Sequence, residues 1–107
     1  MAIDILLGAI KKIIDTSPSA DFMKAADEEI RKVPGVMDCH DLTGRYYAST
    51  IRMEAHIEVD PIMTVQESHE IIDSVVARVR ARFDDVSMLL IHIDPYIPGR
   101  DKEEEGH

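Results

Sequence analysis

The chain has 107 residues, of which 45% are hydrophobic, so it is long enough for one small domain with a modest core. Its formal net charge of −9 at pH 7 disfavours nucleic acid and anionic lipid as partners and favours cations. The single cysteine, Cys39, excludes an internal disulfide and leaves no cysteine pair to hold zinc. Any zinc site would therefore use nitrogen and oxygen ligands.

The chain begins with an apolar pattern that is too short to span a membrane. Isoleucine and leucine recur at helical spacing from Ile3 to Ile14, whereas a membrane helix takes about 20 residues. Ser17-Pro18-Ser19 then interrupts the pattern. We expect residues 1–19 to form a leader helix and linker, as the end of something longer or as an amphipathic helix that needs a partner.

A helix and two strands are predicted next. Ser19 or Asp21 can cap a helix over about 21–33, which ends before Gly35. Strand-like runs follow at 36–42 and 50–59. The second run alternates apolar and polar residues, so one of its faces should be buried and the other polar.

A second helix and a third strand complete the predicted domain. Thr64 and Glu67 have the spacing of a capping box, which predicts a helix that runs to about Arg82. A last strand is expected over 87–94. The folded domain is thus predicted at 20–97, and 98–107 is predicted to be a disordered acidic tail.

The predicted order, α-β-β-α-β, indicates a two-layer α+β domain with a three-stranded mixed sheet. A right-handed strand-helix-strand passage would place the third strand parallel to the second, and both helices would cover one sheet face. Alternation then assigns ten residues to the other face. These are Asp38, His40, Leu42, Glu54, His56, Glu58, Met88, Leu90, His92 and Asp94.

Three of the five histidines fall on this polar face, and Asp94 follows His92 by two residues. A hairpin turn near residues 46–47 would place His40 opposite Glu54 or His56, with Cβ atoms about 5 Å apart. A histidine is more often a structural residue than a ligand, but imidazole and carboxylate groups that converge from separate strands suit a divalent transition metal. His107, in the tail, carries no such information.

His69 and two apolar residues are not explained by the sheet pattern alone. His69 lies on the helical stripe that should face the core, so it is either a ligand at the sheet edge or a packed core histidine. Met88 and Leu90 would be exposed on the polar face of a monomer, which suggests a two-fold dimer interface.

Five segments in this order resemble the cytoplasmic C-terminal domain of cation diffusion facilitators, membrane proteins that exchange zinc or another divalent metal for protons. The resemblance covers about residues 1–95. The segments are Val33-Pro34-Gly35-Val36, His40-Asp41-Leu42, Ala55-His56-Ile57 with Val59-Asp60-Pro61, Glu67-Ser68-His69-Glu70, and Ile91-His92-Ile93-Asp94-Pro95.

The resemblance implies a metallochaperone-like (ferredoxin-like) fold, a V-shaped homodimer and a two-metal cluster near the dimer interface. Zinc is the expected metal, with manganese, iron, cobalt and cadmium as alternatives. Glu54 matches a carboxylate ligand position of magnetosome-associated members. The other implied ligands are His40, His56, His69, His92 and Asp94.

The function that the resemblance implies is a regulatory domain on the cytoplasmic face of a membrane, attached to the transmembrane part of its own parent chain. Metal binding would close the V-shaped homodimer and so regulate transport of a divalent cation. A stand-alone metallochaperone and a purely structural dimerisation domain are the alternatives. An enzyme is not expected, because the sequence has no nucleophile motif, phosphate loop or dinucleotide fingerprint.

Overall fold

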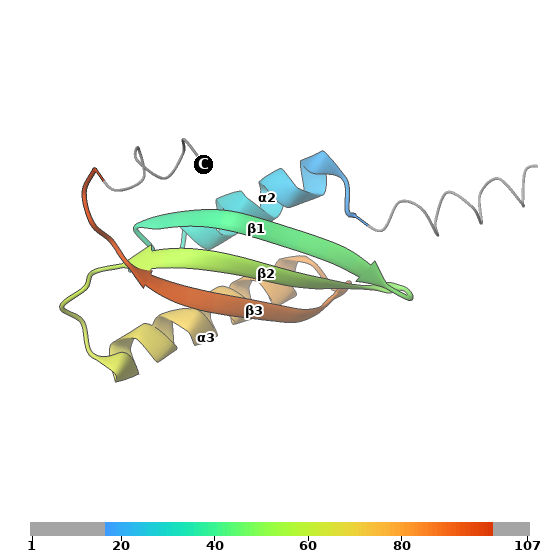
Figure 1. Ribbon diagram of the computed structural model, residues 1–107. Coiled ribbons are helices and arrows are strands. Elements are labelled where there is room, and N and C mark those ends of the chain that lie inside the picture. Colours follow the sequence, from blue (N-terminus) through green and yellow to red (C-terminus); the bar gives the residue numbers. More distant parts are fainter. Residues whose placement is uncertain (1–16, 100–107) are drawn as a thin grey trace, which may run out of the picture.

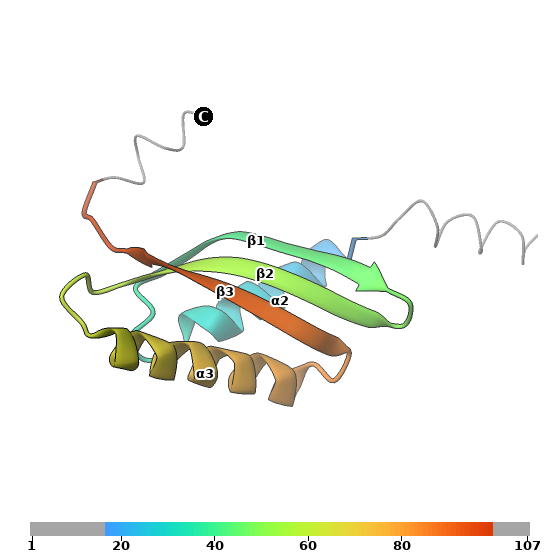
Figure 2. The same ribbon diagram turned by 60° about the horizontal axis from the view of Figure 1, so that its bottom comes forward.

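The computed structural model describes residues 17–99, in which a three-stranded sheet carries both helices on one face (Figures 1 and 2). This confirms the predicted two-layer α-β-β-α-β domain. The expected leader and tail lie largely outside the described residues. The elements are α2 (Ala20–Arg31), β1 (Asp38–Tyr47), β2 (Thr50–Val59), α3 (Val65–Arg82) and β3 (Val86–Pro95).

The sheet has the order β1-β2-β3, with β1 antiparallel and β3 parallel to the central strand β2. The parallel β2-β3 pair confirms the predicted crossover through α3. The hairpin turn lies two residues beyond the predicted position, because Tyr47 pairs with Thr50 across Ala48 and Ser49. Strand β1 consequently extends five residues further than the predicted end at residue 42.

Both helices begin at the predicted capping residues. The Phe22 amide donates a hydrogen bond to Ser19 Oγ, and the Glu67 amide donates one to Thr64 Oγ1, each 3.1 Å long. After α2 the chain reverses at Gly35, where φ is +98°. A Cβ atom there would lie 2.6 Å from Ile71 Cδ1, so glycine is needed both for the backbone angle and for the approach of α3.

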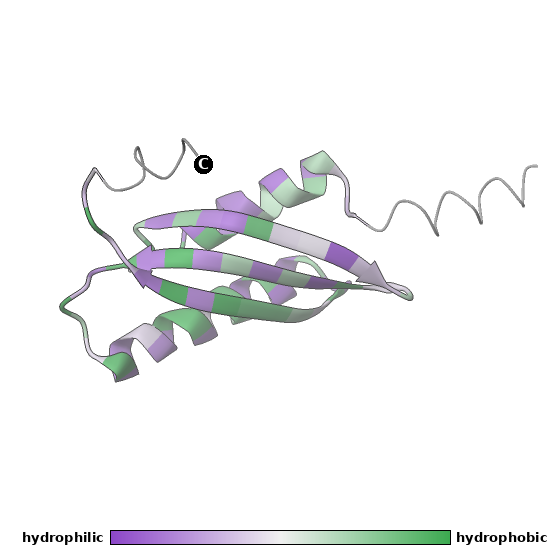
Figure 3. Cartoon of the chain, in the orientation of Figure 1, coloured by the Kyte–Doolittle hydropathy of each residue, from purple (hydrophilic) through white to green (hydrophobic). Residues whose placement is uncertain are grey.

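The core lies between the sheet and the two helices. Hydrophilic and hydrophobic residues alternate along β2 (Figure 3), so that every second side chain of this strand points into the core. Fourteen hydrophobic residues are buried there within the described part of the chain. They are Ala26, Ile30, Val33, Cys39, Ile51, Met53, Ala55, Ile57, Val59, Val75, Val79, Val86, Leu89 and Ile91.

The placement of Leu42 on the polar face was wrong, because β1 contains an irregularity between His40 and Thr43. Asp41 adopts a positive φ of 52°, and the extra residue shifts the alternation of the strand by one position. Leu42 packs against the core instead. Thr43 pairs with Glu54 and takes its place on the polar face.

An ion cluster joins the two helices beneath the sheet. Glu29 of α2 is 7% exposed and accepts hydrogen bonds of 2.7 Å from Arg78 Nε and 2.5 Å from Arg82 Nη1. Lys32 Nζ lies 3.6 Å from the same carboxylate. The hydrogen bonds from Arg78 and Arg82 lower the pKa of Glu29 from 4.5 to about 2.

Replacing Glu29 with glutamine should lower the melting temperature at pH 7. The melting temperature of the variant should also fall less steeply than that of the wild type as the pH is lowered. Because the folded pKa of Glu29 lies below its ordinary value, its stabilisation is fully present above about pH 4.5 and is lost as the pH falls towards 2. The melting temperature of the wild type should therefore exceed that of the variant at pH 7, and the two melting temperatures should become equal as the pH falls to 2. Glu28→Gln, at an exposed neighbouring carboxylate, is the control. If the melting temperatures of wild type and Glu29→Gln differed by the same amount at every pH, Glu29 would not be the ionised, stabilising group described here.

Candidate metal centre

Three histidines form a row across the polar face of the sheet. His40 of β1 pairs with His56 of β2, and His56 pairs with His92 of β3. The rings stack nearly parallel, with centroids 5.3 Å apart for the first pair and 4.6 Å for the second. Backbone pairing thus brings together three of the sequence-predicted ligands.

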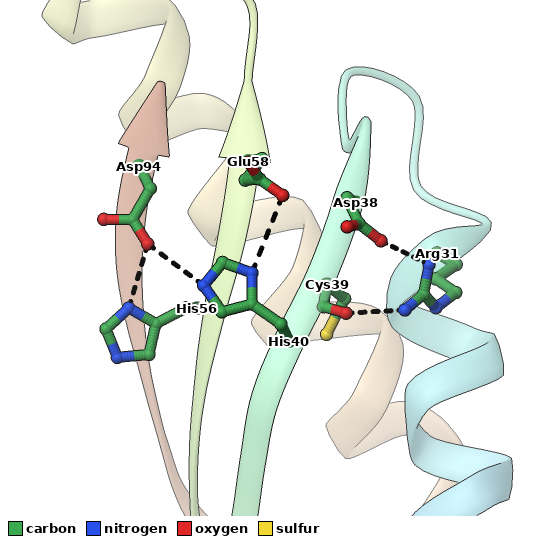
Figure 4. A network of polar contacts seen from close by, with 7 residues as sticks. All are labelled: Arg31, Asp38, Cys39, His40, His56, Glu58 and Asp94. Atoms are coloured by element: carbon green, nitrogen blue, oxygen red, sulfur yellow. Dashed lines mark hydrogen bonds and ion pairs between the residues drawn. The ribbon is translucent and has the colours of Figure 1, made fainter. Parts of the chain in front are cut away.

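Asp94 faces one nitrogen atom on each of two of these imidazole rings (Figure 4). Its Oδ2 atom is 3.0 Å from His56 Nδ1 and 3.4 Å from His40 Nε2. The three side chains are between 32% and 40% exposed, so a cation in solution can reach them. Each residue offers one ligand atom, and all three atoms lie within 4.8 Å of one another. This spacing is compact enough for one cation to contact all three.

A second cluster adjoins the first and shares His56 with it. It consists of Glu54, His56 and His92, again with ligand atoms within 4.8 Å of one another. His92 Nε2 lies 2.5 Å from Glu54 Oε1 at the more exposed end of the row. Two adjoining groups that could each hold a cation thus lie on the same sheet face.

A third cluster joins Asp38, His40 and Glu58. Asp38 and Glu58 were assigned to the polar face from the sequence but were not predicted as part of the site. Glu58 is only 3% exposed, and its Oε2 atom lies 3.6 Å from His40 Nδ1. The repeated spacing Glu54-His56-Glu58, with Asp38 two residues before His40, is the signal that could have found them.

Asp38 is held by the helix layer. Arg31 of α2 donates a 2.6 Å hydrogen bond to Asp38 Oδ1 and a 2.5 Å bond to the carbonyl oxygen of Cys39. Burial alone would raise the pKa of Asp38, but hydrogen bonds from Arg31 and from the Cys39 amide lower it below its ordinary value. Asp38 is therefore an anion at neutral pH.

Cys39 points to the opposite side of β1, as predicted for a core residue. Its side chain is buried, and burial raises the pKa of the thiol to about 12. A thiol with this pKa is protonated at neutral pH and is a poor metal ligand. The candidate metal centre among residues 17–99 thus offers nitrogen and oxygen atoms as ligands.

His69 is not brought into any of the three clusters that the described residues form. It is exposed near the start of α3, on the helix side of the sheet, so the packed-core alternative was wrong. Met88 and Leu90 are exposed beside the clusters, as expected, at 52% and 51%.

Comparison with known proteins places this geometry in a family. Residues 18–96 match the family model described as cation efflux protein, cytoplasmic domain. Metal tolerance protein C1 of Arabidopsis thaliana is 33% identical over 87 residues, which are 81% of this chain and 18% of that protein. Cation-efflux pump FieF of Shewanella oneidensis is 30% identical over 94 residues, 88% of this chain and 31% of the pump.

Solved structures agree with these matches. A cadmium form of a MamM CTD variant with one substitution superimposes with a TM-score of 0.70 and 29% identity, covering 73% of this chain and 98% of that one. Manganese, nickel and zinc forms of other single-substitution variants of the MamM CTD are also similar. The chain spans less than a third of the length of the two curated relatives above, and between residues 17 and 99 it has no helix with the length and hydropathy of a membrane span. This chain belongs to the family of cation efflux protein cytoplasmic domains.

Proposed function

We propose that the domain is the metal-sensing, dimerising regulatory part of a divalent-cation efflux transporter. The observation that carries this proposal is the position of Asp94. One of its two carboxylate oxygens, Oδ2, faces nitrogen atoms of both His40 and His56. Family membership supports the transporter context, and the cadmium, manganese, nickel and zinc forms of the MamM CTD support divalent metals as ligands.

The residues present fit such a cation. The cluster of His40, His56 and Asp94 would hold one ion, and the cluster of Glu54, His56 and His92 would hold a second beside it. A mixed nitrogen and oxygen set suits zinc, whereas the two carboxylates also admit harder ions such as manganese or iron. Cobalt and cadmium are further candidates. A bound cation supplies coordination bonds that tie β1, β2 and β3 together at this face.

A second copy of the chain is the proposed partner at the same face. Met88 and Leu90 expose apolar surface on the edge strand β3, next to His92. A two-fold contact there would bring the clusters of two copies towards each other. His69, which stands outside the clusters of its own chain, would then contribute to a site only beside a partner copy.

Regulation would follow from a difference in affinity between two arrangements of this dimer. The closed V must hold the cation more tightly than the open one, because a ligand with equal affinity for both shifts no population. The segment over 1–19 would transmit the change to the transmembrane part of the parent chain. A stand-alone metal-binding module and a structural dimerisation domain remain the competing functions, and no enzymatic activity is proposed.

Equilibrium dialysis against zinc, manganese and iron, followed by metal counting, tests the proposal. We expect about two zinc ions per chain, because the five ligands of the two adjoining clusters exceed the four that one tetrahedral ion takes. Failure of all three metals to bind in stoichiometric amounts would leave only the structural dimerisation domain.

A further inference from the structure

Glu58 occupies an unusual position for a carboxylate. It lies in the central strand β2, directly opposite Asp38 on one side and Asp94 on the other, and it is only 3% exposed. Removing a carboxylate from water is costly, and two neighbouring carboxylates add to that cost. Contacts of Glu58 with the rest of the network must therefore offset a considerable penalty.

The two nitrogen atoms of His40 face different carboxylates (Figure 4). Nε2 lies 3.4 Å from Asp94 Oδ2, at the cluster with His56, whereas Nδ1 lies 3.6 Å from Glu58 Oε2. At 3.6 Å the second contact is electrostatic, and a small rotation of the ring would shorten it to a hydrogen bond. A histidine that binds metal through one nitrogen carries its proton on the other, usually towards a carboxylate or carbonyl.

We infer that Glu58 is a positioning residue for the metal centre, which holds the His40 proton on Nδ1 and thereby directs the Nε2 lone pair towards Asp94 and His56. The inference rests on the proposed function, because it takes His40 as a metal ligand. Glu58 would act on a bound cation only through His40. Its role is to select one tautomer and one ring orientation.

The helix layer supports this arrangement from behind. Arg31 binds both the side chain of Asp38 and the carbonyl of Cys39, the two residues that precede His40 in β1. Asp38 is thereby fixed directly opposite Glu58. Polar residues thus connect Arg31 of α2 with Asp38 of β1, which lies opposite Glu58 of β2. Glu58 in turn contacts His40, the proposed ligand.

The competing arrangement is a cation held by Asp38, Glu58 and His40 Nδ1, since these atoms also lie within 4.8 Å of one another. It requires the opposite tautomer, with the proton on Nε2. Each arrangement uses a different nitrogen of the same ring. The location of the proton therefore decides between them.

The test is long-range proton–nitrogen NMR of the isotope-labelled protein at pH 8 in the absence of metal, with the His40 signals assigned from His40→Gln. Wild type should show His40 protonated at Nδ1. Glu58→Leu should move the proton largely to Nε2 and weaken zinc binding about 10- to 100-fold. Glu58→Gln, whose amide oxygen can still accept from Nδ1, should keep the wild-type tautomer and lose less affinity. Glu28→Gln removes an exposed carboxylate and should match wild type in both measurements.

Protonation of His40 at Nε2 in wild type, or an unchanged tautomer in Glu58→Leu, would overturn the inference. The NMR measurement needs no metal, so it is independent of the proposed function. If wild type shows the Nδ1 proton but binds no zinc, metal sensing fails while the positioning of His40 by Glu58 is supported.

Discussion

Replacing His56 and Asp94 together with alanine should abolish stoichiometric zinc binding. His56 belongs to both of the adjoining clusters, and Asp94 is the carboxylate between two rings. Their removal leaves His40 without its two partners and reduces the second cluster to Glu54 and His92. Neither of the two adjoining clusters then keeps three ligands, so the calorimetric titration should lose the two ions per chain that these clusters would hold.

The matched control for this variant is His107→Ala with Asp73→Ala, which removes the same two residue types elsewhere. Asp73 is exposed on α3 and belongs to none of the clusters formed by residues 17–99. This control should bind zinc as wild type does. An unchanged stoichiometry in His56→Ala with Asp94→Ala would remove both residues from the site.

Addition of zinc should shorten and narrow the distance between spin labels placed on α3 of the two copies in a dimer. Ser74→Cys offers an exposed, small position outside the clusters, and Cys39→Ala removes the other thiol of the chain. The distance, measured by pulsed electron paramagnetic resonance, should fall because closing the dimer would bring its two α3 helices closer together. At zinc about 100-fold above Kd, the free energy of unfolding should also rise by about 2.7 kcal/mol for each ion bound.

Two observations control the spin-label experiment. Sedimentation in the absence of zinc should already show a dimer, because the apolar surface at Met88 and Leu90 does not depend on metal. The same labels in a chain that also carries His56→Ala and Asp94→Ala should not respond to zinc. Confirmed binding with an identical distance distribution would leave a storage or structural site and refute regulation by closure.

The helices and the central strand could be predicted to within about two residues, because each carries a local signal. Ser19 and Thr64 cap the helices, and strict alternation marks β2. Strand β1 was predicted too short and Leu42 was placed on the wrong face. The irregularity in β1 depends on the positive φ of Asp41, and this residue interrupts the alternation of side chains between the two faces of the strand.

The face that carries the site followed from alternation, but its membership depends on which residues pair across the strands. The pairing of His40 with His56 was one of two possibilities, and only the observed register selects it. Asp38 and Glu58 were missed because carboxylates on a polar face are usually solvated, and burial of Glu58 arises from the assembled sheet. The predicted ligand role of His69 stays a prediction, since it needs a second copy.

The row of stacked imidazole rings also bears on how quickly the domain can respond to a change in metal concentration. Its ligands stand on three hydrogen-bonded strands, so filling the site requires rotation of side chains and no rearrangement of the backbone. Such rotations take picoseconds to nanoseconds, whereas movements of whole domains take microseconds to milliseconds. Under the proposed function, capture of a cation would thus be fast, and the relative motion of the two copies would set the response time of the parent transporter.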